Sequence, residues 1–82
     1  MAITVEAAQD ELRIILGNIF GLYEFNMTDD IKKDHWLTSI ELFELGMEIE
    51  ESGVNIPQSE LDCCTTLQSI FDIYIKYRCH GS

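Results

Sequence analysis

Ser39 is the residue whose type and surroundings best suit chemistry, because it stands at the expected start of a helix. A nucleophilic serine needs a base and an acid that orients the base, and only His35 and His80 can supply the base. His35 lies four residues away in an expected loop, and Ser39 lacks the flanking glycines of a nucleophile elbow. We therefore expect no catalytic residue and no enzyme activity. Two interpretations stay open: Ser39 only assists helix capping, or another enzyme modifies it.

The three cysteines do not fit a metal site or a disulfide framework. Cys63 and Cys64 are adjacent, without the two-residue gap that lets two cysteines bind one zinc ion, so Cys79 and His80 do not complete a ligand set. An odd number of cysteines fits free thiols in a reducing compartment better than paired ones. We expect no metal, and a cytoplasmic protein.

Length and charge restrict the classes of protein further. The 82 residues suffice for one domain, residues 1–82, and a hydrophobic content of 46% argues against a disordered chain. The net charge of −10 disfavours nucleic-acid binding and favours protein partners with basic patches. No apolar run has the length of a membrane span, and Glu6 soon interrupts the apolar start of the chain, unlike a secretory signal. We expect a monomer.

Apolar periodicity predicts an all-α fold, a small bundle of three longer helices plus one short helix with a long loop between the first and second helices. The first helix is expected over residues 4–16, with Gly17 as its end unless it continues to Gly21. A short turn is expected at residues 58–61. Thr65 or Thr66 caps a last helix that ends near residue 77, so the ordered core is 4–77, and residues 78–82 are expected to be a fraying tail.

The central helix begins with a capping box, in which Thr38 caps the first turn and Glu41 reaches back to the amide of Thr38. Its apolar positions are expected to form one broad buried face. They are Ile40, Phe43, Leu45, Met47 and Ile49. Four glutamates at helical spacing form an acidic ridge without a basic residue: Glu41, Glu44, Glu48 and Glu51. Like charges at this spacing cost helix stability, which indicates a docking surface rather than an ordinary solvated face.

The segment 21–37 has no sustained periodicity and contains turn-forming residues. Its acidic residues lack the spacing of a calcium loop, and we expect a solvated loop at Asp29, Asp30 and Asp34. Its apolar residues are expected to pin the loop to the helices. They are Leu22, Tyr23, Phe25, Met27, Ile31 and Trp36.

Three segments together are similar to one known family. Residues 34–40 read DHWLTSI, residues 49–57 read IEESGVNIP, and residues 64–67 read CTTL. They resemble, in order, the DLGxDSL signature, the LEEFGVxIP segment and the LTTV helix entry of the acyl and peptidyl carrier proteins. The likeness covers nearly the whole chain.

The resemblance implies a discrete carrier protein with a 4′-phosphopantetheine arm, derived from coenzyme A, on Ser39. It implies shuttling of acyl or aminoacyl thioesters between enzymes of polyketide, nonribosomal peptide or specialised fatty-acid biosynthesis. The implied partners are a phosphopantetheinyl transferase and loading ligases, synthases or transferases with basic docking patches. The implied docking residues are His35, Trp36, Thr38, Ile40, Glu41, Glu44, Glu48 and Glu51.

Departures from the family pattern concentrate before the serine. Thr38 stands where the family has aspartate, and His35 and Trp36 stand where it has Leu-Gly. Ser52 replaces a core aromatic residue and Cys64 a core leucine, which weakens packing or opens cavity space. These changes indicate a dedicated pathway. The alternative hypothesis is an acidic helical adaptor that docks a basic partner and is never modified.

Overall fold

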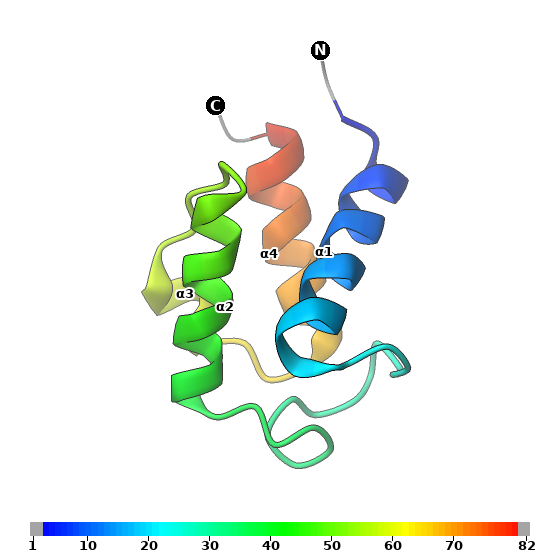
Figure 1. The fold of residues 1–82 in the computed structure, drawn as a ribbon, viewed down its shortest axis with the longest axis vertical. Coiled ribbons are helices and arrows are strands. Elements are labelled where there is room, and N and C mark those ends of the chain that lie inside the picture. Colours follow the sequence, from blue (N-terminus) through cyan, green and yellow to red (C-terminus); the bar gives the residue numbers. More distant parts are fainter. Residues whose placement is uncertain (1–2, 81–82) are drawn as a thin grey trace.

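The computed structural model describes residues 3–80, in which the chain forms four α-helices and no strand (Figure 1). The helices are α1 (Val5–Phe20), α2 (Ser39–Glu51), α3 (Gln58–Asp62) and α4 (Leu67–His80). The predicted small helical bundle, with one long loop after the first helix and one short helix, is therefore confirmed.

The three longer helices place the start of α2 at one end of the molecule. In Figure 1, α1 runs from the end at which α4 finishes toward the opposite end, and α2 and α4 run back. The long loop crosses the far end and leads into Ser39, the first residue of α2. Ser39 thus lies at the end of the bundle away from the start of α1 and the end of α4.

The end of α1 is set by Gly21 and not by Gly17. Thr4 begins the helix by accepting the Ala7 N–H on its Oγ1 at 3.1 Å. Gly21 ends it with a left-handed φ of 65°. Gly17 is buried inside the helix, and a Cβ there would meet the ring of Tyr23. The predicted stop at Gly17 was wrong because that glycine serves a close contact, whereas the alternative end at Gly21 is confirmed.

The core is formed by one face of each helix together with residues of the loops. Its buried residues are Ala8, Leu12, Leu16, Ile31, Leu37, Leu42, Leu45, Ile49, Val54, Leu61, Cys64, Leu67, Ile70, Phe71 and Tyr74. Gly46 contributes by its size, because a Cβ there would meet Gln58 and Leu61 of α3. The buried thiol of Cys64 has a raised pKa, primarily because burial disfavours the thiolate.

The predicted buried face of α2 was wrong in three of its five positions. Ile40, Phe43 and Met47 are 70%, 54% and 49% exposed. The inner face is instead Leu42, Leu45 and Ile49. Both sets have the spacing i, i+3, i+7, so the helical period fits either of them. Packing in the bundle selects the all-aliphatic set and turns the other set outward.

The last helix continues beyond the predicted fraying point, because Arg78 is tied to α1. Its Nε donates to Glu11 Oε1 at 2.9 Å and its Nη2 donates to Glu11 Oε2 at 3.2 Å. The buried Tyr74 hydroxyl also donates to Glu11 Oε1, at 3.0 Å. Burial and then this carboxylate raise the pKa of Tyr74 to about 12. The prediction of a fraying tail was therefore wrong for residues 78–80, and its last two residues, Gly81 and Ser82, lie outside the described residues.

Glu11 is expected to stabilise the protein only when it is ionised. The Arg78 guanidinium holds the pKa of Glu11 below its ordinary value, so its contribution is present above about pH 4.3, the unfolded pKa, and is lost as the pH falls through the folded pKa. Glu11→Gln should lower the thermal midpoint by a few degrees at pH 7. The difference from wild type should shrink as the pH falls below about 4.3 in a series of circular-dichroism melts. A difference that stays constant with pH would contradict this role.

Candidate functional site

The start of α2 presents Ser39 in a fixed setting. The Glu41 carboxylate accepts the Thr38 backbone N–H at 3.3 Å and the Thr38 hydroxyl at 2.9 Å, and the predicted capping box is confirmed. Ser39 is exposed as the first helical residue. Its hydroxyl is thus available to another enzyme, while the capping box orders its backbone.

Three apolar side chains of α2, which we call the apolar stripe, are exposed and follow Ser39 at helical spacing: Ile40, Phe43 and Met47. Trp36, which lies ahead of the helix, is also exposed, at 79%. Phe43 and Met47 were not predicted as surface residues. The signal that identifies them is the competing Leu42, Leu45 and Ile49 pattern, which accounts for the buried face without them.

The predicted acidic ridge lies on α2, but its members differ in exposure. Glu44 and Glu51 are exposed, Glu48 is half-buried, and Glu41 is half-buried within the capping box. Glu50, which sequence reasoning missed, is also exposed. We call Glu44, Glu48 and Glu51 the acidic edge. No Lys or Arg occurs in the sequence from residue 34 to residue 75, so α2 has no basic residue of its own to neutralise this edge.

Trp36 has a backbone conformation that bulky residues rarely adopt. Its φ is 59°, in the left-handed region. Its N–H donates to the Lys32 carbonyl at 3.2 Å, and the next N–H, that of Leu37, donates to the Ile31 carbonyl at 2.8 Å. Leu37 is thereby turned into the core while Trp36 is left on the surface. The prediction that Trp36 pins the loop was wrong, because its side chain is largely exposed. Tyr23 is also largely exposed, but its ring lies against Gly17 of α1.

The end of α1 provides an internal comparison for this turn. The Gly21 N–H donates to the Gly17 carbonyl at 3.0 Å, and the Leu22 N–H donates to the Leu16 carbonyl at 3.3 Å. The offsets of four and six residues are those found at Trp36, with a φ of 65° at Gly21. The chain therefore makes the same left-handed turn twice, once with glycine, which adopts a positive φ readily, and once with tryptophan.

The predicted solvated loop is ordered by its aspartates. Asp30 Oδ1 accepts the N–H groups of Lys32 and Lys33 at 2.9 and 2.8 Å, and Asp34 Oδ2 accepts the Asp30 N–H at 2.7 Å. The Lys33 N–H is the main cause that lowers the pKa of Asp30. These carboxylates act as local caps of the turn that precedes Trp36.

His35 lies inward from the apolar stripe. Its Nε2 is 2.8 Å from Asp29 Oδ2, and its side chain is only 15% exposed. The His35 ring meets the Phe25 ring edge-on. The Arg13 guanidinium lies over the rings of Phe25 and Phe71. The Asn26 N–H and, after it, His35 hold the pKa of Asp29 below its ordinary range. His35 thus fixes the loop that leads to Ser39.

No protein-family model, curated protein or solved structure matches this chain. Within residues 3–80, no helix is long and apolar enough to cross a membrane. Among the side chains of residues 3–79, no group of three or more histidine, cysteine or acidic side chains is arranged to hold a metal ion. What the site can do therefore follows from its own geometry.

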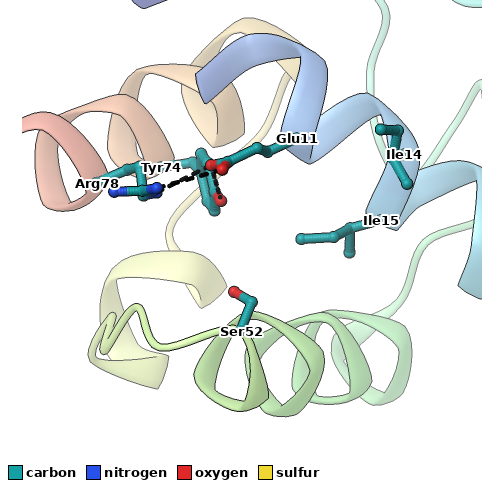
Figure 2. Close-up of a pocket in the computed structure, with 6 residues that line it drawn as sticks. All are labelled: Glu11, Ile14, Ile15, Ser52, Tyr74 and Arg78. Carbon is teal, nitrogen blue, oxygen red and sulfur yellow. Dashed lines mark hydrogen bonds and ion pairs between the residues drawn. The ribbon is translucent and has the colours of Figure 1, made fainter. Parts of the chain in front are cut away.

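A cavity of about 230 Å³ lies between α1, the end of α2 and α4. Figure 2 shows the Glu11, Tyr74 and Arg78 side chains joined on one side of it, with Ile14, Ile15 and Ser52 on the others. The Ser52 hydroxyl donates to the Ile49 carbonyl at 2.6 Å. Ser52 is itself exposed, so the expectation that a small residue at position 52 opens space in the bundle stays a prediction.

Filling this cavity should stabilise the fold. Ser52→Phe would place a ring near Ile14, Ile15 and Tyr74, and at about 25 cal/mol per Å² of apolar surface removed from water the gain is about 1 kcal/mol. Denaturant titration should show a higher midpoint for Ser52→Phe than for wild type. Ser52→Ala, which cannot fill the space, is the control and should not rise. A midpoint for Ser52→Phe below that of Ser52→Ala would contradict the proposed fit.

Trp36→Gly should be more stable than Trp36→Ala. Both variants remove the ring, but only glycine relieves the left-handed backbone, which costs other residues about 1–2 kcal/mol. The glycine variant loses about 0.5–1 kcal/mol of this gain in stability, because glycine gives the unfolded chain more conformational freedom than alanine does. The expected net difference is about 0–1.5 kcal/mol, and each 1 kcal/mol corresponds to roughly 4–8 °C in the thermal midpoint of a domain of this size. A midpoint of Trp36→Gly below that of Trp36→Ala would contradict the strain at position 36.

Proposed function

We propose that this protein is a carrier that holds a 4′-phosphopantetheine arm on Ser39 and shuttles thioester-bound acyl or aminoacyl intermediates between enzymes. The observation that carries the proposal is an exposed serine at the first position of a capped acidic helix, flanked by apolar side chains. The likeness of residues 34–40, 49–57 and 64–67 to carrier-protein segments gives this serine its chemistry.

Electrostatics favour a phosphodiester at this position. A group on Ser39 Oγ stands beside the N-terminal end of α2, where unpaired backbone N–H groups and the helix dipole favour an anion. The apolar stripe and the acidic edge extend from the serine along the same helix. An enzyme that binds this surface would meet the arm and its cargo together.

The carrier's contribution is tethering. A covalently held intermediate reaches each enzyme at a high effective concentration once the carrier has docked. The proposed partners are a phosphopantetheinyl transferase and loading or transferring enzymes with basic docking patches. The proposed pathway is a dedicated one, of the polyketide, nonribosomal peptide or specialised fatty-acid kind, because His35 and Trp36 depart from the family's usual Leu-Gly.

Incubation with coenzyme A, magnesium and a broad-specificity phosphopantetheinyl transferase tests the site. Wild-type protein should gain the mass of one arm, and Ser39→Ala should gain none. Ser59→Ala, which removes another exposed helical serine, is the matched control and should be modified like wild type. Modification of Ser39→Ala would overturn the assignment of the site.

An unmodified acidic adaptor is the competing function. The exposed apolar stripe favours it, because docking through this surface needs no arm. It predicts that Ser39→Ala functions normally in cells and that protein purified from its native source carries no added mass. A native protein heavier by one arm would exclude it.

A further inference from the structure

The cavity between α1, the end of α2 and α4 has a polar side and an apolar side (Figure 2). Glu11, Tyr74 and Arg78 are joined on the polar side, and Ile14 and Ile15 line the apolar side. Tyr74 is only 1% exposed, whereas Ile14 is 63% exposed. The tyrosine therefore lies deep in the cavity and Ile14 lies at its rim, so a small molecule can enter without unfolding the bundle.

The size of the cavity restricts what it can hold. Its volume is about 230 Å³. Pockets for drug-sized ligands span about 300–1,000 Å³, whereas a cavity of about 150 Å³ binds benzene. The cavity is also distant from Ser39, because Ser52 at its edge follows the 13 residues of α2, which span about 20 Å along the helix axis. A single ring with one or two substituents fits here, at a site apart from Ser39.

Hydrogen bonds within the chain leave a defined capacity for a ligand. Glu11 Oε1 accepts from the Tyr74 hydroxyl and from Arg78 Nε, and Glu11 Oε2 accepts from Arg78 Nη2. Because a carboxylate oxygen can accept about two hydrogen bonds, Oε2 keeps one acceptor site, and the guanidinium keeps most of its N–H donors. The Ser52 hydroxyl already donates to the Ile49 carbonyl, so it can only accept from a ligand. The polar side therefore offers both donors and acceptors.

Charge favours a neutral ligand. Glu11 and Arg78 form an ion pair at 2.9 Å, so an anion in the cavity would meet the carboxylate and a cation would meet the guanidinium. The net charge of −10 adds to the repulsion of anions. Taking a charged group out of water without a counter-charge of its own is also costly. A hydroxyl group donates and accepts through one oxygen and carries no charge, so it can bond to Glu11 and Arg78 together.

We propose that this cavity binds a small neutral hydroxyl compound, with the hydroxyl between Glu11 and Arg78 and a ring-sized apolar body against Ile14 and Ile15. The proposal goes beyond the carrier function and does not depend on it. Ser39→Ala, which has no hydroxyl to modify at that position, should bind the compound as well as wild type does. Failure of the modification of Ser39 and failure of this binding are thus separate results.

The probe is para-cresol, a benzene ring with one hydroxyl and one methyl group. Titration into isotope-labelled protein, followed by nuclear magnetic resonance, should shift the amide signals of α1 and α4 beside the cavity with millimolar affinity. Ser52→Phe, which fills the cavity, should weaken binding about tenfold or more. Phe43→Ser, at an exposed apolar residue of α2 outside the cavity, is the control and should leave the affinity unchanged.

Analogues of the probe test the hydrogen-bond and charge arguments. Toluene lacks the hydroxyl, and 4-methylbenzoate and 4-methylbenzylamine are an anion and a cation at pH 7. All three should bind wild type more weakly than para-cresol, the charged ones by about tenfold. Glu11→Gln deprives Arg78 of its counter-ion, so this variant should prefer 4-methylbenzoate to para-cresol.

Three results would overturn the proposal. The first is the absence of para-cresol binding to wild type, and the second is equal affinity of wild type and Ser52→Phe. The third is an unchanged order of the analogues in Glu11→Gln, because a crevice that is only apolar would not respond to the loss of this carboxylate.

Discussion

The site depends first on the packing of Leu42, Leu45 and Ile49 into the core, because this contact fixes the rotation of α2 about its own axis. A helix with two apolar stripes can bury only one of them in a small bundle. With the aliphatic set inside, Ile40, Phe43 and Met47 must face outward beside Ser39. The exposure of the apolar stripe therefore follows directly from the packing of the aliphatic residues of α2 into the core, and no separate loop or domain is required to present it.

The loop before α2 is the second constraint. Its aspartates cap its own backbone, and main-chain hydrogen bonds join it to the start of α4: the Leu67 N–H donates to the Asp29 carbonyl and the Gln68 N–H to the Met27 carbonyl. Asp29 also holds His35. A long connection without helices is thus ordered by local polar contacts, and it delivers Ser39 and Trp36 in defined positions. The chemistry proposed for Ser39 uses a platform that core and loop hold together.

Sequence reasoning predicted the helix order, the capping box at Thr38 and, as the alternative to Gly17, the end of α1 at Gly21, because each rests on local rules of spacing and capping. It assigned the wrong residues to the buried face of α2, because the buried and the exposed apolar residues of this helix have the same spacing. It also failed at Arg78, whose partner Glu11 lies 67 positions away in the chain. The strain at Trp36 had no local signal within this sequence alone. Long-range packing decides such features, and local patterns do not contain it.

The direction of the helices has a consequence for how the protein can be attached to other molecules. Residues near the start of α1 and near the end of α4 lie at one end of the bundle, and the start of α2 lies at the other (Figure 1). A linker, affinity tag or solid support joined at either of those positions would leave the approach to Ser39 open. The same arrangement of the helices would thus leave Ser39 accessible both in the free protein and in an attached one.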